Sequence, residues 1–240
     1  MNIMGDFIYK KAKPLPVILL LDTSGSMSID DNIGTMNRAV REMIRDFQKA
    51  ANSEANISVA IVTFGKTTGV YQRLKDVSEM DPDSINMECY GMTPLGAALA
   101  AAKAIIEDKE QIPSRSYRPT VVLVSDGEPN DDWEAALNAF MNEGRSSKCY
   151  RMAMGIGVTK GTQAYKVLQQ FVSNEERVFD ASNASEISEF FQYVTISTTS
   201  RTASANPNMI PSFADVTEKK VSAHENPEGE DDDLGGLLPF

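Results

Sequence analysis

Residues 17–26 read Val-Ile-Leu-Leu-Leu-Asp-Thr-Ser-Gly-Ser, a run of five apolar residues that ends in an acidic, hydroxyl-rich turn. A run this short is typical of a strand that is buried on both of its faces. Such strands belong to parallel sheets that helices cover on both sides. Ligands bind such sheets beyond the carboxyl ends of the strands, so the polar turn is the first place to look for a site.

The same alternation of apolar runs and amphipathic stretches continues to about residue 195. Strands are expected at 57–64, 120–125, 150–156 and 177–179, and residues 70–74 should form a hairpin with 57–64. Helices are expected at 38–51, 94–107, 133–141, 162–171 and 184–194. This order predicts an α/β fold: a doubly wound, Rossmann-like, mostly parallel sheet with one antiparallel edge strand and helices on both faces.

The 240 residues divide into a lead-in at 1–15, one folded domain at 16–196, and a flexible segment at 197–240. Residues 197–204 are rich in Ser and Thr and are interpreted as a linker, either a simple polar hinge or a phosphorylation target. From Asp215 onward eight acidic residues and two lysines give the tail a net charge of −6. Its apolar end, which begins at Leu234, is either a docking peptide for a partner or part of a solubilising tail.

Composition excludes several classes of function. The net charge of −11 makes nucleic acid a poor partner, because phosphate binding needs a cationic surface. The two cysteines, Cys89 and Cys149, form no C-x-x-C pair, so we expect neither a disulfide framework nor a thiolate metal site. No stretch approaches the roughly 20 apolar residues that cross a bilayer, and residues 1–13 lack the apolar core of a secretory leader. A cytoplasmic protein without a membrane partner is expected.

Three polar segments follow the apolar runs and should meet at one edge of the sheet. They supply Asp22, Ser24 and Ser26, then Thr93 in the loop Gly-Met-Thr-Pro at 91–94, and finally Asp126 in Ser-Asp-Gly. All five offer oxygen ligands, which favour a hard cation over zinc or copper. We expect Mg²⁺, with Mn²⁺ or Ca²⁺ as alternatives. Thr93 is also expected to cap the helix that follows it.

These segments resemble the metal ion-dependent adhesion site of von Willebrand factor type A domains, over residues 16–195. The resemblance implies that Ser24, Ser26 and Thr93 contact the metal, that Asp22 and Asp126 lie in the inner or second shell, and that an Asp or Glu of a partner protein completes the coordination. This chain has Gly-Met-Thr at 91–93 where family members often have Gly-Gly-Thr.

Within that family, residues 19–27, 91–99 and 124–129 resemble the bacterial cytosolic branch, above all the TerY-like proteins of tellurium-resistance and stress systems. The resemblance implies a role in a bacterial stress-response or phage-defence signalling complex. It also implies two kinds of partner, a Ser/Thr kinase and a PP2C-type phosphatase.

Three other functions are alternatives to metal-dependent protein binding. In a structural scaffold, the metal would only stabilise the fold. A magnesium-dependent phosphatase or phosphotransferase of the haloacid dehalogenase type would need a second aspartate two residues after Asp22, where this chain has Ser24. A serine hydrolase would need a base, and the only histidine, His224, lies in the acidic tail. The chain also lacks a phosphate-binding loop and a dinucleotide fingerprint. We therefore expect no enzymatic activity.

Overall fold

The computed structural model describes residues 12–50, 55–173 and 176–209. Its strands form one six-stranded sheet in the order β3-β2-β1-β4-β5-β6. All neighbours are parallel except β2 and β3, so the predicted antiparallel edge strand is confirmed. The strands are β1 (Lys13–Thr23), β2 (Ala55–Gly65), β3 (Gly69–Asp76), β4 (Thr120–Ser125), β5 (Tyr150–Ile156) and β6 (Val178–Ala181).

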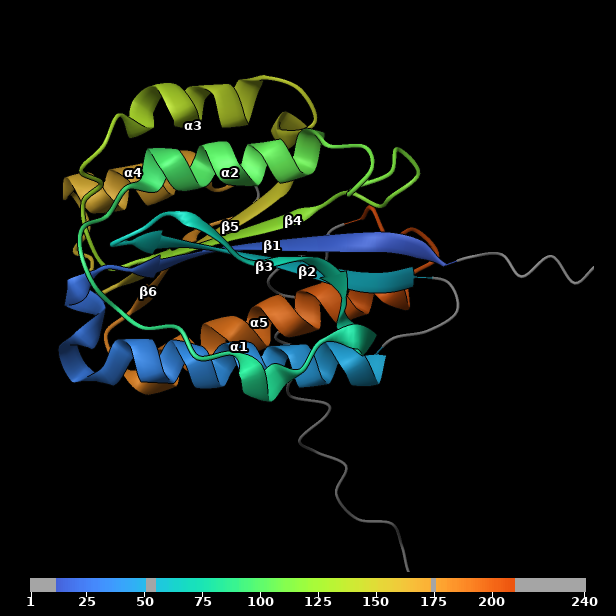
Figure 1. Ribbon diagram of the computed structural model, residues 1–240, viewed down its shortest axis with the longest axis horizontal. Helices are drawn as coiled ribbons and strands as arrows, with labels where there is room; N and C mark the ends of the chain where they lie inside the picture. Colours follow the sequence, from blue (N-terminus) through green and yellow to red (C-terminus); the bar gives the residue numbers. More distant parts are fainter. Residues whose placement is uncertain (1–11, 51–54, 174–175, 210–240) are drawn as a thin grey trace, which may run out of the picture. The chain divides into compact units, whose positions relative to one another are not determined.

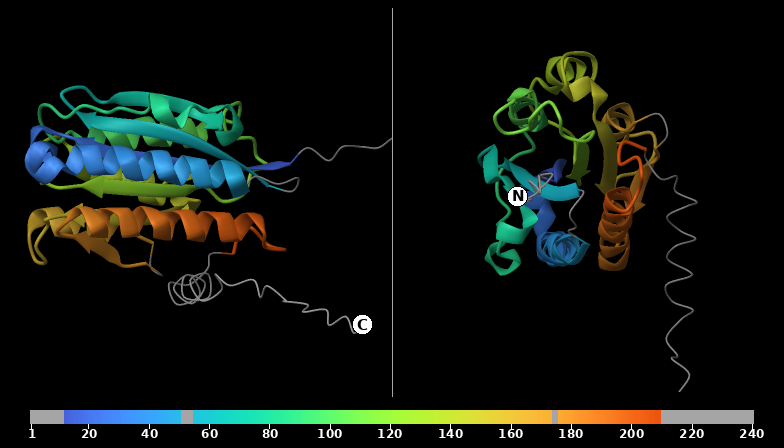
Figure 2. Two further views of the ribbon diagram at one scale, coloured as in Figure 1. Left: turned by 90° about the horizontal axis from the view of Figure 1, so that it is seen from below. Right: turned by 90° about the vertical axis from the view of Figure 1, so that its right-hand side faces the viewer.

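Five α-helices cover the two faces of the sheet, as the doubly wound pattern predicts. Helices α2, α3 and α4 lie on one face, and α1 and α5 lie side by side on the other (Figure 1; Figure 2). Their bounds are α1 (Asn32–Ala50), α2 (Leu95–Glu107), α3 (Trp133–Asn142), α4 (Gln163–Phe171) and α5 (Ala184–Thr202). Among the helices of the described ranges, none is both long and apolar enough to cross a lipid bilayer.

The central strands are buried on both faces because helices cover each side. Side chains alternate along a strand, so Ile18 and Leu20 of β1 pack into the cluster formed with α2, α3 and α4. Val17, Leu19 and Leu21 are equally buried on the alternate positions. Each such side chain contributes roughly 1.5–3 kcal/mol relative to exposure. The apolar run at residues 17–21 is therefore the centre of the core.

The expected linker is wrong at residues 197–202. Helix α5 continues to Thr202, and Ser197, Thr198 and Arg201 are each at most 2% exposed. The hydroxyl of Thr199 donates to the Thr195 carbonyl one turn earlier, so Ser- and Thr-rich sequence is compatible with the helix here. The acidic tail from residue 210 lies outside the described residues.

Arg201 explains why this polar stretch is buried. Its guanidinium donates to the Pro207 carbonyl at 2.6 Å, the Thr120 hydroxyl at 2.8 Å and the Arg118 carbonyl at 2.6 Å. Burial, and secondarily the charge of Arg118, lower the pKa of Arg201 to about 10. These bonds fasten the end of α5 to the amino end of β4, at the pole of the sheet opposite the carboxyl ends of the parallel strands.

Candidate metal centre

The carboxyl ends of β1 and β4 mark the point where the winding of the sheet reverses. The chain leaves β1 through α1 toward β2 on one side, whereas β4 leads through α3 to β5 on the other. Loops diverge at such a point and leave a crevice, which is where open α/β sheets bind ligands. Leu21 pairs with Val124 in the parallel ladder, so Asp22 and Ser125 come next to each other at its end.

Asp22 is fully buried at the end of β1. Its Oδ1 accepts the backbone N–H of Ser24 at 2.8 Å, and its Oδ2 accepts the hydroxyl of Ser125 at 2.6 Å. The first bond folds the turn after β1 back over the carboxylate. The second fixes the orientation of the carboxylate from the neighbouring strand.

Ser24, Ser26 and Asp126 form a contiguous cluster beside Asp22. The two serine oxygens lie 3.0 Å apart. Asp126 Oδ1 accepts the Ser26 hydroxyl at 2.9 Å and the Ser24 hydroxyl at 3.4 Å. Ser24 is buried, Asp126 is half-buried and Ser26 is exposed, so the cluster opens to solvent on the side of Ser26.

Thr93 reaches the cluster from the loop before α2. Its side-chain oxygen would lie 3.8 Å from a Cβ built on Gly127, the residue after Asp126. Its role as a helix cap is not what was expected: α2 starts at Leu95, and the residue at its cap position, Pro94, makes no side-chain capping bond. The structure thus brings all five predicted residues to one edge of the sheet and leaves Thr93 without the capping role.

Two carboxylates share this site without a basic side chain. Burial raises the pKa of Asp22 to about 6, and the charge of Asp126 adds to this rise against the bonds from Ser125 and Ser24. Burial likewise raises the pKa of Asp126, opposed by the Ser26 hydroxyl. No Lys, Arg or His within the described ranges forms an ion pair with either carboxylate. A bound cation would supply the missing positive charge.

Sequence reasoning missed three contributors to the site. Ser125 has no assigned role in the motif, yet its hydroxyl orients Asp22. Asp131 accepts the backbone N–H groups of Gly96 and Ala97 at the start of α2. Gly91, with φ of +85°, accepts the N–H of Gly25 and leaves no space for a Cβ, which would lie 2.5 Å from Lys66 Cα. Of these three residues, only Gly91 could have been expected from the sequence, because glycine often marks a backbone conformation that other residues rarely adopt.

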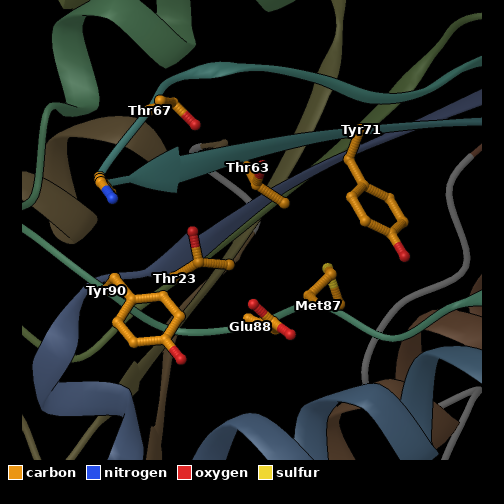
Figure 3. A pocket seen from close by; sticks show the side chains of 8 residues that line it. Thr23, Thr63, Thr67, Tyr71, Met87, Glu88 and Tyr90 are labelled. Atoms are coloured by element: carbon orange, nitrogen blue, oxygen red, sulfur yellow. The ribbon is translucent and has the colours of Figure 1, made fainter.

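A polar pocket of about 210 Å³ lies beside the end of β1 (Figure 3). Thr23, which lies between Asp22 and Ser24, shares its lining with Tyr90, Glu88 and Tyr71. Two further contacts hold the segment that forms one wall. Asn37 exchanges hydrogen bonds of 2.9 Å with both backbone groups of Met87, and Tyr90 N–H donates to the Thr23 carbonyl at 2.8 Å. Hydrogen bonds therefore hold the backbone of the pocket wall in place. The pocket lies next to Thr23, which stands between the candidate ligands Asp22 and Ser24.

The residues present fit a hard divalent cation. Three hydroxyls and two carboxylates provide only oxygen, which Mg²⁺, Mn²⁺ and Ca²⁺ prefer. No group of three or more His, Cys, Asp or Glu side chains gathers anywhere in the described part of the chain, so the hydroxyls are needed to complete any site here. A metal held mainly by neutral hydroxyls keeps more of its charge for an external anionic ligand than one surrounded by carboxylates.

Comparison with known proteins shows the family of the fold. Over 113 residues the chain is 29% identical to an uncharacterized protein of Mycobacterium tuberculosis, a match that covers 46% of this chain and 17% of that protein. The chain therefore spans less than a fifth of the length of that relative.

Several solved structures share the fold at low identity. Proximal thread matrix protein 1 from the mussel byssus, whose metal ion-dependent adhesion site holds zinc in one structure, superimposes with a TM-score of 0.58 at 21% identity, over 77% of this chain and 45% of that one. The pilus adhesin SpaC of Lactobacillus rhamnosus GG gives 0.62 at 16% identity, over 77% of this chain and 30% of that one. A von Willebrand factor type A protein from Catenulispora acidiphila gives 0.57 at 18% identity, over 78% and 43%.

The family model of the von Willebrand factor type A domain matches residues 17–193, a span that begins in β1, contains all five residues of the cluster and ends within α5. The chain belongs to the von Willebrand factor type A domain family.

Proposed function

We propose that this domain binds a divalent cation, Mg²⁺ in the cell, and uses it to hold an acidic side chain of a partner protein. Ser24, Ser26 and Thr93 are the direct ligands, and Asp22 and Asp126 act in the inner or second shell. The observation that carries the proposal is the convergence of these five oxygen-bearing side chains at the switch point, with two carboxylates and no basic partner among the described residues. The bound metal supplies a positive charge that attracts a carboxylate from outside.

The surroundings of the cluster support a protein partner. Six large apolar side chains in the described ranges are exposed, and three of them, Ile29, Tyr90 and Met92, are 60–64% exposed in the two segments that carry Ser26 and Thr93. Tyr71 is another of the six exposed side chains, and it lines the neighbouring pocket together with Tyr90. Exposed apolar groups gathered around a polar site are typical of protein interaction surfaces. In the proposal, these side chains contact the residues that flank the acidic group of the partner.

The cellular setting is a further part of the proposal. The motif segments at 19–27, 91–99 and 124–129 resemble the TerY-like branch, which supports a cytoplasmic stress-response or phage-defence complex that includes a Ser/Thr kinase and a PP2C-type phosphatase. The same reading makes the domain a binding module without catalytic activity. A docking role for residues 234–240 also belongs to this proposal.

The first experiment measures metal binding by the protein itself. Calorimetric titration with Mg²⁺ and Mn²⁺ should give saturable binding to the wild type and none to the double variant Asp22→Ala/Ser24→Ala. Ser28→Ala is the matched control, because Ser28 lies in the same turn but donates its hydroxyl to the Gly25 carbonyl and not to the cluster. Equal titrations of all three proteins would contradict the proposed site.

The second experiment separates recognition from scaffolding. Wild-type protein and the double variant are used as baits in cell extract, each with Mg²⁺ and with EDTA. A partner held only by the wild type in Mg²⁺ supports metal-dependent recognition. A partner held in all four conditions favours the alternative, a scaffold whose metal only stabilises the fold. Tyr90→Ser and Met92→Ser should then weaken capture of the same partner without changing metal affinity, whereas Val70→Ser, on the edge strand β3, should change neither.

A further inference from the structure

The loop that follows Asp126 also holds the loop that carries Thr93. Asn130 N–H donates to the Thr93 carbonyl at 3.2 Å. One residue later, Asp131 Oδ1 accepts the N–H of Gly96 and Oδ2 accepts the N–H of Ala97, both at 2.9 Å. Three hydrogen bonds thus join residues 130–131 to residues 93–97. Thr93 lies in the second of these segments, and Asp126 lies four residues before the first.

Asp131 occupies the place of a helix cap that the local sequence does not provide. The first N–H groups of a helix need acceptors from outside the helix, and a residue just before the helix usually supplies one. Here Pro94 makes no side-chain capping bond, and Asp131 reaches α2 from 35 residues further along the chain to satisfy two of these groups. A carboxylate is also favoured at the positive end of the helix dipole.

Gly96 lets the two loops touch backbone to backbone. A Cβ at this position would lie 2.9 Å from both the Asp132 carbonyl oxygen and Trp133 Cα, and 3.0 Å from Asp131 Oδ2. No side chain therefore fits between the start of α2 and residues 131–133 unless the loops move apart. The two loops are already in close contact at Gly96, so the position of Thr93 relative to Asp126 depends on this contact.

We propose that Asp131 is a positioning residue of the metal centre, which fixes the separation of Thr93 from Asp126 by holding the start of α2 against the loop at 126–132. The inference rests on the proposed function, because it presumes that Thr93 and Asp126 serve the same metal. Asp131 itself does not touch the metal. It acts through two backbone N–H groups that lie three and four residues after Thr93.

The test is the affinity of the full chain for Mn²⁺, measured by calorimetry together with the melting temperature of each variant. Asp131→Ala should bind Mn²⁺ about 10- to 100-fold more weakly, the usual range for groups that orient metal ligands. Asp131→Asn keeps one side-chain acceptor for the helix N–H groups and should recover part of that loss.

The matched control is Asn183→Ala. Asn183 caps α5 in a similar way, with its Oδ1 accepting the N–H groups of Ser185 and Glu186 at 3.0 and 3.1 Å, but it follows the edge strand β6 and not β1 or β4. It should lower the melting temperature about as much as Asp131→Ala and leave Mn²⁺ affinity unchanged. If both variants weaken Mn²⁺ binding equally, Asp131 has only a general effect on stability and the proposal is wrong.

The other outcomes are also decisive. A wild type that binds no Mn²⁺ defeats the proposed function itself, whatever the variants do. A wild type that binds, with Asp131→Ala binding equally well, overturns only the positioning role. If Asp131→Asn loses as much affinity as Asp131→Ala, the charge of Asp131 matters and not its hydrogen bonds to α2. That outcome also overturns the positioning role. Should Asp131→Ala fail to fold, Gly96→Ala replaces it, because its methyl group pushes the same loops apart; wild-type affinity in that variant would overturn the proposal.

Discussion

The hydroxyl of Ser125, the last residue of β4, donates to Oδ2 of Asp22 on the neighbouring strand β1 at 2.6 Å. Both groups are buried, so removing the hydroxyl leaves Oδ2 of Asp22 without this donor. Ser125→Ala should therefore leave the Asp22 carboxylate held only by the Ser24 N–H and weaken Mg²⁺ affinity about 10- to 100-fold. Calorimetric titration checks this, with Ser188→Ala on α5, whose hydroxyl donates to the Ala184 carbonyl, as the control. Unchanged affinity in Ser125→Ala would mean that the turn after β1 orients Asp22 unaided.

Replacing Asp126 by Asn should have opposite effects without and with metal. The charge of Asp126 raises the pKa of Asp22, which is the signature of repulsion between the two carboxylates. In EDTA, Asp126→Asn should therefore melt at a higher temperature than the wild type. In Mg²⁺ at ten times the Kd the wild type gains about 1.4 kcal/mol by mass action, whereas the variant gains less because it binds the metal more weakly. Thermal melts in both conditions check the reversal, and a variant that is less stable than the wild type in EDTA would contradict it.

Glu176 makes stability depend on pH away from the metal centre. Its carboxylate accepts the hydroxyls of Tyr150 and Tyr193, and burial raises its pKa above the ordinary value despite the Tyr193 bond and the nearby Arg177 charge. The folded state thus binds this proton more tightly than the unfolded state. The contribution of Glu176 to stability is fully present below the unfolded-state pKa and is lost as pH rises through the folded-state pKa.

Glu176→Gln stays neutral at every pH, so it should gain in melting temperature relative to the wild type as pH rises from 4 to 7. Melting curves across that range measure the difference. Glu189→Gln, an exposed position on α5, should show no such trend. If the difference in melting temperature between the wild type and Glu176→Gln does not change with pH, the pKa of Glu176 is the same in the folded and unfolded states.

Arg201→Ala should be strongly destabilising. The substitution removes three hydrogen bonds, leaves the acceptors on Pro207, Thr120 and Arg118 without their donor, and opens a cavity where a fully buried side chain was. A loss of about 2–4 kcal/mol is expected from these causes. Urea denaturation checks it, with the exposed Arg115→Ala expected to stay within about 0.5 kcal/mol of the wild type. A small effect of Arg201→Ala would show that α5 is held by its apolar face alone.

The order of elements could be predicted because it depends on local pattern. Residues 17–21 are all apolar, and residues 120–125 are apolar between the flanking Thr120 and Ser125. Burial of a strand on both faces requires such runs. The five candidate ligands are predictable for the same reason, since four follow an apolar run and Thr93 lies just before a helix. Their roles as ligands stay predictions, although the structure brings the five together.

What the sequence alone could not predict depends on contacts between distant residues. The end of α5 contains four Ser or Thr residues at 197–200, which local propensity assigns to a linker. Its burial depends on Arg201 meeting acceptors at residues 118 and 120, about 80 positions earlier. Asp131 is similar: nothing in its surroundings indicates that it satisfies the N–H groups of a helix that begins at Leu95.

The bonds around Arg118 bring both ends of the described domain to one place. Tyr117 N–H donates to the Pro14 carbonyl at 2.9 Å, and Arg118 N–H donates to Asn208 Oδ1 at 2.7 Å, so the entry into β1 and the exit after α5 are neighbours. Asp22 lies near the other end of β1, about 26 Å from Pro14 for eight residues of extended strand. A tether attached to the described residues at this pole, such as a biotin for a sensor chip, is remote from the edge of the sheet that carries Asp22. The described domain can therefore be immobilised in one defined orientation, with every copy presenting the candidate metal site to the solution.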